Sequence, residues 1–275
     1  MTFDLIIKNC NIVTSQGVLK GTVSVDEGKI VAISSPTTLF DATKVIDAKE
    51  SYLLPGVIDP HVHFGHRPKG FEKNLEDDQE SLLNGGVTSV FSFIGEQEAY
   101  PKFIPPIIEG IQTTALIDVG IHTVINNREQ LADVPECAQK FGITSLKFFI
   151  ANRGGVQLYP STKSVDDGTF YEGLGIVAKL GAPMIALAHC ENWEIADLMV
   201  EKLKAEGRND QAAWADSRPN ICEEEAMRRA SFLALRSNSS LYIVHISTRE
   251  GPDVLREFRD KGSKLKGEVC IHHLT

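Results

Sequence analysis

Long apolar runs are missing from this sequence of 275 residues. A membrane helix needs about 18 consecutive apolar residues, and Asp118 and His122 interrupt the longest candidate stretch. The first four residues, MTFD, also lack the cationic start and apolar core of a signal peptide. We therefore expect a cytoplasmic protein with no membrane partner.

Basic runs are missing as well, and the net charge is −9. A nucleic-acid partner would need clustered Lys and Arg side chains to neutralise phosphates, so we expect none. The five cysteines are odd in number, far apart and form no Cys-x-x-Cys. This usage is typical of reduced thiols and argues against a disulfide framework or a structural zinc site.

The pattern that is present changes near residue 54. Residues 1–53 contain short β-branched segments separated by turns such as Gln16-Gly17 and Glu27-Gly28, and they indicate a small β unit. From residue 54 onwards, apolar strand segments alternate with helical segments, which predicts an α/β protein with a parallel sheet covered by helices. No early Gly-x-Gly-x-x-Gly marks an open dinucleotide-binding sheet.

A (β/α)8 TIM barrel fits the alternation better. The expected barrel strands are Val57–His61, Val87–Phe93, Ile117–Val124, Ser145–Ile150, Met184–Ala188, Leu241–His245 and Glu268–His272. The expected helices include Leu75–Leu83, Gln130–Phe141, Tyr171–Leu180, Trp193–Glu206, Glu223–Ser237 and Gly251–Lys261. A complete barrel takes about 250 residues. We therefore expect residues 54–275 to form a barrel domain truncated after the seventh strand, with the eighth strand absent.

The segment Leu54–Gly65 ends an apolar run with two histidines, His61 and His63. Alternate residues of a strand point to the same side, so both imidazoles can reach one ion. The segment therefore reads as a strand that ends in half of a metal site. The alternative is that two histidines share a strand-to-loop junction by coincidence, and further ligands at suitable places would decide against it.

Three more candidate ligands lie in or at the ends of later barrel strands, namely Lys147, His189 and His245. In such barrels the carboxyl ends of the strands meet at one rim, where catalytic residues lie. Each histidine alone could be a hydrogen-bonded core residue. Lys147 is flanked by Leu146 and Phe148, so its ammonium needs a carboxylate partner, a route to the barrel rim, or conversion by CO₂ to a carbamate that can bridge two cations.

With these residues in place, the sequence resembles the cyclic amidohydrolases of the amidohydrolase superfamily, which include hydantoinases, dihydropyrimidinases, allantoinases and dihydroorotases. The resemblance covers essentially the whole chain, as an N-terminal portion of such a protein, and it implies that residues 1–53 are the N-terminal strands of a small β-sandwich. It is carried by Asp4–Asn9, Asp26–Ile30, Leu54–His63, Gly85–Thr88, His189–Asn192, Ser217–Pro219, Glu223–Ala230 and Val244–Ser247.

The resemblance implies two divalent metal ions, with zinc as the default and manganese, iron or nickel also compatible. His61, His63 and a carboxylated Lys147 would hold the more buried ion, and Lys147, His189 and His245 the more exposed one. A hydroxide that bridges the ions would attack a ring carbonyl, which makes Lys147 a catalytic residue. The family also uses an aspartate at the end of the eighth strand, and no residue here can be assigned that role, so we expect the chain alone to be inactive.

The ring that is hydrolysed is less clear from the sequence. Dihydroorotases have an arginine where this chain has Gly65, and D-hydantoinases have a tyrosine where it has Asn152, the candidate substrate-binding residue. We expect a hydantoin or dihydropyrimidine-type substrate, with an allantoinase or dihydroorotase-like hydrolase as the alternative. A metal-free scaffold protein of the same fold is the non-enzyme alternative, and the resemblance also implies a homodimer or homotetramer.

Overall fold

The computed structural model describes residues 2–37, 40–64, 70–151, 157–159 and 162–274. The chain divides into two compact units, Met1–Val57 and Ile58–Thr275. Within the described residues, no helix combines the length and the apolar character that a bilayer crossing demands.

The first unit is a five-stranded sheet with the order β3-β2-β1-β4, in which β5 also pairs with β1. Its strands are β1 (Thr2–Thr14), β2 (Gly17–Asp26), β3 (Lys29–Ser34), β4 (Asp41–Asp47) and β5 (Tyr52–Leu53). The strand β1 continues from Thr2 to Thr14, and its pairing with β2 shifts between Ile7 and Cys10. Asn9, in the left-handed region at φ 56°, makes the bulge. Cys10, Ile12 and Val23 form the small core of this unit.

The second unit contains a seven-stranded sheet with the order β14-β13-β12-β9-β8-β7-β6. The strands are β6 (Val57–Val62), β7 (Val87–Ile94), β8 (Asp118–Val124), β9 (Ser145–Ile150), β12 (Ile185–Cys190), β13 (Ser240–Ile243) and β14 (Lys264–Gly267). From β7 to β14, neighbouring strands pair in parallel. A short hairpin, β10 (Gln157–Tyr159) and β11 (Thr162–Lys163), follows β9.

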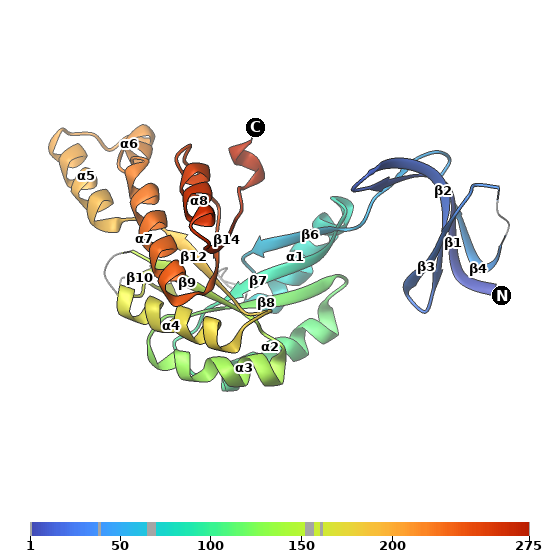
Figure 1. Ribbon diagram of the computed structural model, residues 1–275, viewed down its shortest axis with the longest axis horizontal. Helices are drawn as coiled ribbons and strands as arrows, with labels where there is room; N and C mark the ends of the chain where they lie inside the picture. Colours follow the sequence, from blue (N-terminus) through green and yellow to red (C-terminus); the bar gives the residue numbers. More distant parts are fainter. Residues whose placement is uncertain (1, 38–39, 65–69, 152–156, 160–161, 275) are drawn as a thin grey trace. The chain divides into compact units, whose positions relative to one another are not determined.

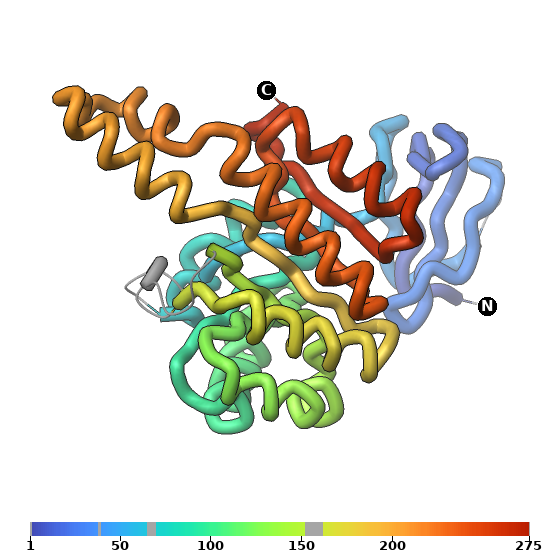
Figure 2. The backbone as a smooth tube through the Cα atoms, turned by 60° about the vertical axis from the view of Figure 1, so that its left-hand side comes forward, coloured from blue at the N-terminus to red at the C-terminus, as the bar shows by residue number. Residues whose placement is uncertain are grey.

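Most helices cover the outer face of this curved sheet, whereas α5 (Trp193–Ala205) and α6 (Gln211–Asp216) extend away from it (Figures 1 and 2). The covering helices are α1 (Phe71–Asn84), α2 (Tyr100–Thr114), α3 (Val134–Phe141), α4 (Asp167–Leu180), α7 (Ile221–Ser237) and α8 (Gly251–Asp260). Two single-turn 3₁₀ helices, Glu129–Asp133 and Ile271–His273, complete the described elements. The expected fold class, an α/β barrel sheet without its eighth strand and a separate N-terminal sheet, is confirmed for the described chain.

The strand β9 shows why this sequence folds as a barrel strand. All six of its residues are buried, as expected for a parallel strand covered on both faces. Leu146 and Phe148 pack in the layer beneath the helices, whereas Phe149 joins an inner cluster with Phe93 and Leu187. Alternate residues therefore serve two different layers, and Lys147 falls on the same inner face as Phe149.

The seventh barrel strand was predicted at the wrong place. It is Lys264–Gly267, with Leu265 buried, whereas Glu268–His272 continues into a 3₁₀ turn. Val269 and Ile271 alternate as in a strand, but their side chains are 49% and 76% exposed. The alternation was therefore misleading, and the strand begins directly after the turn at Gly262.

Two smaller differences concern β13 and α2. Strand β13 ends at Ile243, so His245 lies just beyond it rather than within it. The helix α2 was not predicted, because Pro105 and Pro106 lie inside it and proline normally interrupts a helix. Its buried residues Tyr100 and Ile104 anchor it to the core despite those prolines.

Candidate metal centre

The five predicted ligands come together at the carboxyl ends of the barrel strands. His61 lies in β6 and His63 directly after it, Lys147 lies in β9, His189 lies near the end of β12, and His245 follows β13. The register of the sheet keeps β9 and β12 aligned, since Leu187 pairs with Lys147 and His189 with Phe149. Parallel strands therefore present these side chains at one rim, as the sequence predicts.

The four imidazoles form two close pairs. His61 Nε2 lies 3.2 Å from His63 Nε2, and His189 Nδ1 lies 3.0 Å from His245 Nε2. The rings of His61 and His245 connect the pairs, with centroids 5.5 Å apart. Two nitrogens bound to one zinc ion at near-tetrahedral angles are about 3.3 Å apart. Each pair therefore has the nitrogen spacing that one ion requires.

Lys147 lies beside two aromatic rings, Phe93 and Phe149, each of which contacts one imidazole pair. Its Nζ is 4.9 Å from the ring centroid of Phe93 and 4.9 Å from that of Phe149. The Phe93 ring also lies 4.5 Å from the ring of His61, and the Phe149 ring lies 5.2 Å from that of His189. The lysine therefore occupies the position between the two imidazole pairs.

The environment of Lys147 favours the neutral amine. The side chain is 1% exposed, and burial lowers the pKa of Lys147 to about 7 because an ammonium loses its hydration there. Within the described ranges, no carboxylate oxygen forms an ion pair with Nζ. The carboxylate partner considered from the sequence is thus not found among the described residues, and a neutral amine able to react with CO₂ remains.

Burial also lowers the pKa values of the second pair. The pKa of His245 falls to about 2 and that of His189 falls as well, in both cases mainly because burial disfavours the imidazolium. The positive charge that Lys147 would carry acts in the same direction. Neutral imidazoles are the form that binds a metal ion.

A carboxylate stands behind one imidazole of each pair. Glu268 contacts Nδ1 of His61, and Glu191 lies 3.6 Å from Nε2 of His189. Burial raises the pKa of each carboxyl, but hydrogen bonds from the neighbouring groups outweigh it, so both pKa values are lowered and both groups are ionised near neutral pH. Arg218 Nε, 3.4 Å from Glu191, supports that charge. Carboxylates at the far nitrogen of ligating histidines orient the ring and fix its tautomer.

Sequence reasoning missed Glu268 as a functional residue. It was assigned to the seventh strand, while the structure places it directly after β14 (Lys264–Gly267). The signal that could have found it was an acidic side chain at the carboxyl end of a barrel strand, the same rule that selected the histidines.

His122 is a second buried residue that the site prediction did not include. Its Nε2 lies 3.0 Å from the carbonyl oxygen of Pro60, and its Nδ1 lies 2.5 Å from Oγ of Ser145. Burial lowers the pKa of His122 to about 4, so the ring is neutral. Because a carbonyl can only accept, Nε2 carries the proton and the Ser145 hydroxyl donates to Nδ1. His122 thus ties β8 and β9 to the residue that precedes His61.

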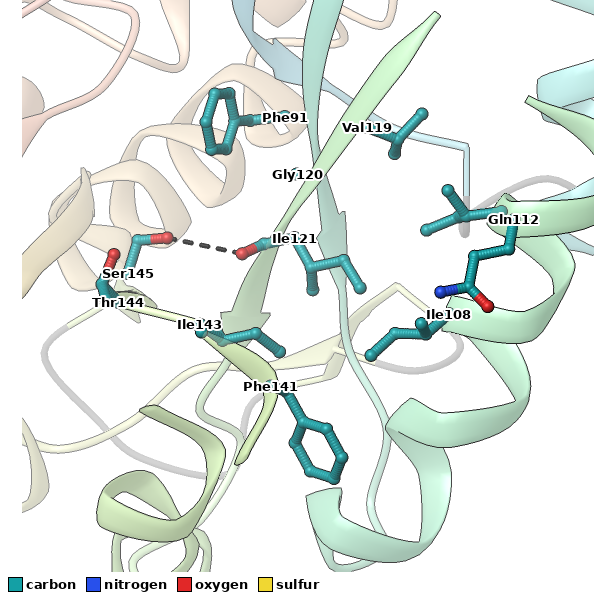
Figure 3. Close-up of a pocket in the computed structure, with 12 residues that line it drawn as sticks. Phe91, Ile108, Gln112, Val119, Gly120, Ile121, Phe141, Ile143, Thr144 and Ser145 are labelled. Carbon is teal, nitrogen blue, oxygen red and sulfur yellow. Dashed lines mark hydrogen bonds between the residues drawn. The ribbon is translucent and has the colours of Figure 1, made fainter. Parts of the chain in front are cut away.

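The opposite ends of the strands hold a different feature. A cavity of about 320 Å³ lies beside the first residues of β8 and β9, and Figure 3 shows the Ser145 hydroxyl there, 3.5 Å from the Ile121 carbonyl oxygen. Apolar side chains such as Ile108, Phe141 and Ile143 dominate its walls. Its described lining includes no charged residue and no predicted ligand, so it is separate from the candidate metal centre.

A surface group of possible ligands also differs from the predicted one. Ligand atoms of Cys270, His272 and His273 lie within 4.8 Å of one another. His273 Nδ1 is, however, 3.1 Å from the Ile246 carbonyl oxygen and 3.4 Å from the backbone nitrogen of Cys270, so it is already engaged by the backbone. The candidate substrate residue Asn152 and the position Gly65 lie outside the described residues.

Comparison with curated proteins gives relatives along the whole chain. A D-hydantoinase of Geobacillus stearothermophilus is 32% identical over 277 residues, which cover 98% of this chain and 56% of the relative. An allantoinase of Escherichia coli O9:H4 (strain HS) is 29% identical over 282 residues, which cover 100% of this chain and 60% of the relative. The chain thus spans less than two thirds of either relative. No family model matches the sequence.

Solved structures give the same picture. A D-hydantoinase crystal structure matches with a TM-score of 0.85 at 32% identity, covering 98% of this chain and 58% of that one. The L-hydantoinase (dihydropyrimidinase) from Arthrobacter aurescens matches with a TM-score of 0.86 at 27% identity, covering 97% and 58%. The fold described above is therefore similar to that of solved hydantoinases along nearly the whole of this chain.

Proposed function

Because the chain is homologous over its whole length to the N-terminal part of cyclic amidohydrolases of the amidohydrolase superfamily, we propose that the protein hydrolyses the ring amide of a small cyclic substrate and uses two divalent metal ions. The observation that carries this proposal is the arrangement of two imidazole pairs on either side of the buried Lys147. The relatives span more residues than this chain, so the proposal concerns the whole protein.

The donor set fits two ions. Imidazoles are neutral when they bind a metal ion, and the contact with Glu268, which accepts, would then keep the proton of His61 on Nδ1 and leave the lone pair of Nε2 for the ion. In the second pair, Nδ1 of His189 faces Nε2 of His245 at 3.0 Å and would be the ligand atom, with Glu191 3.6 Å from the other ring nitrogen. We assign His61 and His63 to one ion and His189 and His245 to the other, with zinc as the default. When bound, the ions would acidify a water molecule and polarise the substrate carbonyl.

Lys147 would complete both sites as a carbamate. The neutral amine that burial favours adds to CO₂, forming a nitrogen–carbon bond and releasing one proton. The product carries two oxygens on one planar group, and one oxygen can face each imidazole pair. The same reaction removes the cost of an ammonium that has no carboxylate partner among the described residues. This role for Lys147 is part of the proposal.

Two experiments test the proposal. Metal analysis of the purified protein, with mass spectrometry of Lys147, should give about two metal ions per chain and a carboxylated lysine. Less than about one ion per chain together with an unmodified Lys147 would support the alternative, a scaffold protein that keeps the fold without the chemistry. We also propose a homodimer or homotetramer, which light scattering would test.

A substrate screen addresses the ring. The relatives are named for hydantoin, dihydropyrimidine and allantoin rings, and identities of 32% and 29% do not separate them. We propose a hydantoin or dihydropyrimidine-type ring, with allantoin or dihydroorotate as the alternative. Parallel assays with hydantoin, dihydrouracil, allantoin and dihydroorotate would decide, because the ring with the highest kcat/KM identifies the class.

A further inference from the structure

We propose that Glu268 is the positioning residue that couples the two halves of the metal centre, by fixing the tautomer of His61 and holding the backbone of His245. The inference rests on the proposed function, because it treats both imidazoles as ligands. The Glu268 side chain is 13% exposed and lies at the carboxyl end of the seventh barrel strand.

The first contact sets which nitrogen of His61 faces its partner. Oε1 of Glu268 contacts Nδ1 of His61, and an ionised carboxylate has no proton to donate. With a metal ion bound at Nε2, the His61 proton would lie on Nδ1, where Oε1 of Glu268 accepts it, and His61 Nε2 lies 3.2 Å from His63 Nε2. Without the carboxylate, a neutral imidazole could carry its proton on either nitrogen, and a proton on Nε2 would prevent that nitrogen from binding the ion.

The second contact fixes the carboxylate itself. The hydroxyl of Tyr242 donates to Oε2 of Glu268 over 2.9 Å. Tyr242 lies on β13 and pairs in register with Lys266 of β14, so the phenol and the carboxylate project from neighbouring strands. Oε1 and Oε2 are thus each engaged by a different partner, and the Glu268 side chain has one defined orientation.

The third contact reaches the other imidazole pair. The backbone N–H of His245 lies 3.3 Å from Oε1 of Glu268. His245 has φ 40°, a left-handed conformation that is unfavourable for a residue with a side chain. The backbone of Glu268 brackets this strained residue, since its N–H donates to the Ile243 carbonyl over 3.0 Å and its carbonyl accepts from Ile246 over 2.8 Å.

One residue therefore orients a ligand in each pair. Among the described residues, Glu191, the carboxylate behind His189, contacts one imidazole and has Arg218 as its other ionic partner. A buried carboxylate that served stability alone would need hydrogen-bond donors of any kind. The donors to Glu268 include the His61 ring and the His245 backbone, which belong to different imidazole pairs. Removing its charge should therefore weaken metal binding more than it weakens folding.

The test compares Glu268→Gln with the wild-type protein in a chelator-competition titration with Zn²⁺ alone, in bicarbonate buffer. The amide keeps an acceptor for His61 but removes the charge, and loss of such a partner typically lowers metal affinity 10- to 100-fold. We expect the Zn²⁺ dissociation constant to rise about 10- to 100-fold, with little change in Tm. Asp133→Asn is the matched control, because Asp133 is also a half-buried carboxylate that accepts a backbone N–H, from Tyr100, and it contacts none of the imidazoles in the part of the chain that the structure describes.

Nitrogen NMR of the metal-free wild type gives a second readout that needs no stable variant. At a pH at which the His61 ring is neutral, it should be the Nδ1–H tautomer, whereas Glu268→Ala should give a mixture. A wild-type Nε2–H tautomer, or unchanged Zn²⁺ affinity in Glu268→Gln, would overturn the role of Glu268 and leave the proposed function intact. Failure of the wild type to bind Zn²⁺ would instead remove the proposed function itself.

Discussion

The rings of Phe149 and His189 lie with their centroids 5.2 Å apart and their planes at 34°. The Phe149 ring, which also lies beside Lys147, therefore contacts an imidazole of the second pair. These residues are partners in the register of β9 and β12. The pairing of β9 with β12 therefore sets the positions of both rings. The environment of the Lys147 amine depends on the same packing.

Replacing Lys147 by alanine should abolish hydrolysis. The variant loses both oxygens that would bridge the ions, and we expect kcat/KM to fall at least about 10³-fold. Short carboxylates such as acetate or propionate should restore part of the activity, because they can enter the space that the side chain leaves. Steady-state assays with and without the acid measure this, and full activity in the unrescued variant would refute the bridging role.

Replacing His189 by alanine should deplete one metal ion selectively. The other pair keeps both nitrogens, His61 Nε2 and His63 Nε2 at 3.2 Å, so about one ion per chain should remain. Metal analysis after exhaustive dialysis provides the count. Equal loss of both ions would contradict the division of the imidazoles into two sites.

Protonation of His122 should lower the stability of the protein as the pH falls into the mildly acidic range. The pKa of His122 is lowered from about 6.5 in the unfolded chain to about 4 in the fold. Between these values the unfolded chain binds more protons, so the free energy of unfolding decreases as the pH falls from 6.5 to 4. For a difference of this size the loss is about 3 kcal/mol.

The variant His122→Gln isolates that contribution. Glutamine can still donate to Pro60 and accept from Ser145, but it does not titrate. Urea unfolding of both metal-free proteins at several pH values should show a shallower acid decline for the variant. Parallel declines would mean that His122 does not supply the pH dependence.

Two glycines of α4 offer a matched test of the packing against β9. A Cβ at Gly173 would lie 2.4 Å from Cζ of Phe148, whereas a Cβ at Gly175 would have nothing within 4 Å. Gly173→Ala should lower the free energy of unfolding by about 1–3 kcal/mol because it overpacks the core. Gly175→Ala should raise it by about 0.5–1 kcal/mol, the helix preference of alanine over glycine. Denaturant unfolding compares the two, and equal effects would show that Phe148 can move aside.

Strand-end reasoning could locate the imidazoles because both of its steps are local. The apolar runs before His61, His189 and His245 mark strands, and parallel strands end at one rim. The flanking apolar residues likewise foretold the burial of Lys147, which is 1% exposed. These inferences required no knowledge of which strands are neighbours.

The partners of the imidazoles could not be foreseen in the same way. Val269 and Ile271 imitate a strand around Glu268, although their side chains face solvent. The contact of Glu268 with His61 depends on the curvature of the whole sheet, because β6 and β14 are its two outermost strands. His122 was missed for a similar reason. Its partner Pro60 lies in β6, two strands away from β8 in the sheet, and its partner Ser145 lies in the adjacent β9.

The contact between His61 and Glu268 joins residues that are 207 positions apart in the sequence. During synthesis on the ribosome, His61 emerges long before the carboxylate that selects its tautomer. A metal ion that arrived early would meet an imidazole free to present either nitrogen, and a sheet whose outer strands had not yet met. Under the proposed function, correct metal loading would therefore follow translation of the seventh strand.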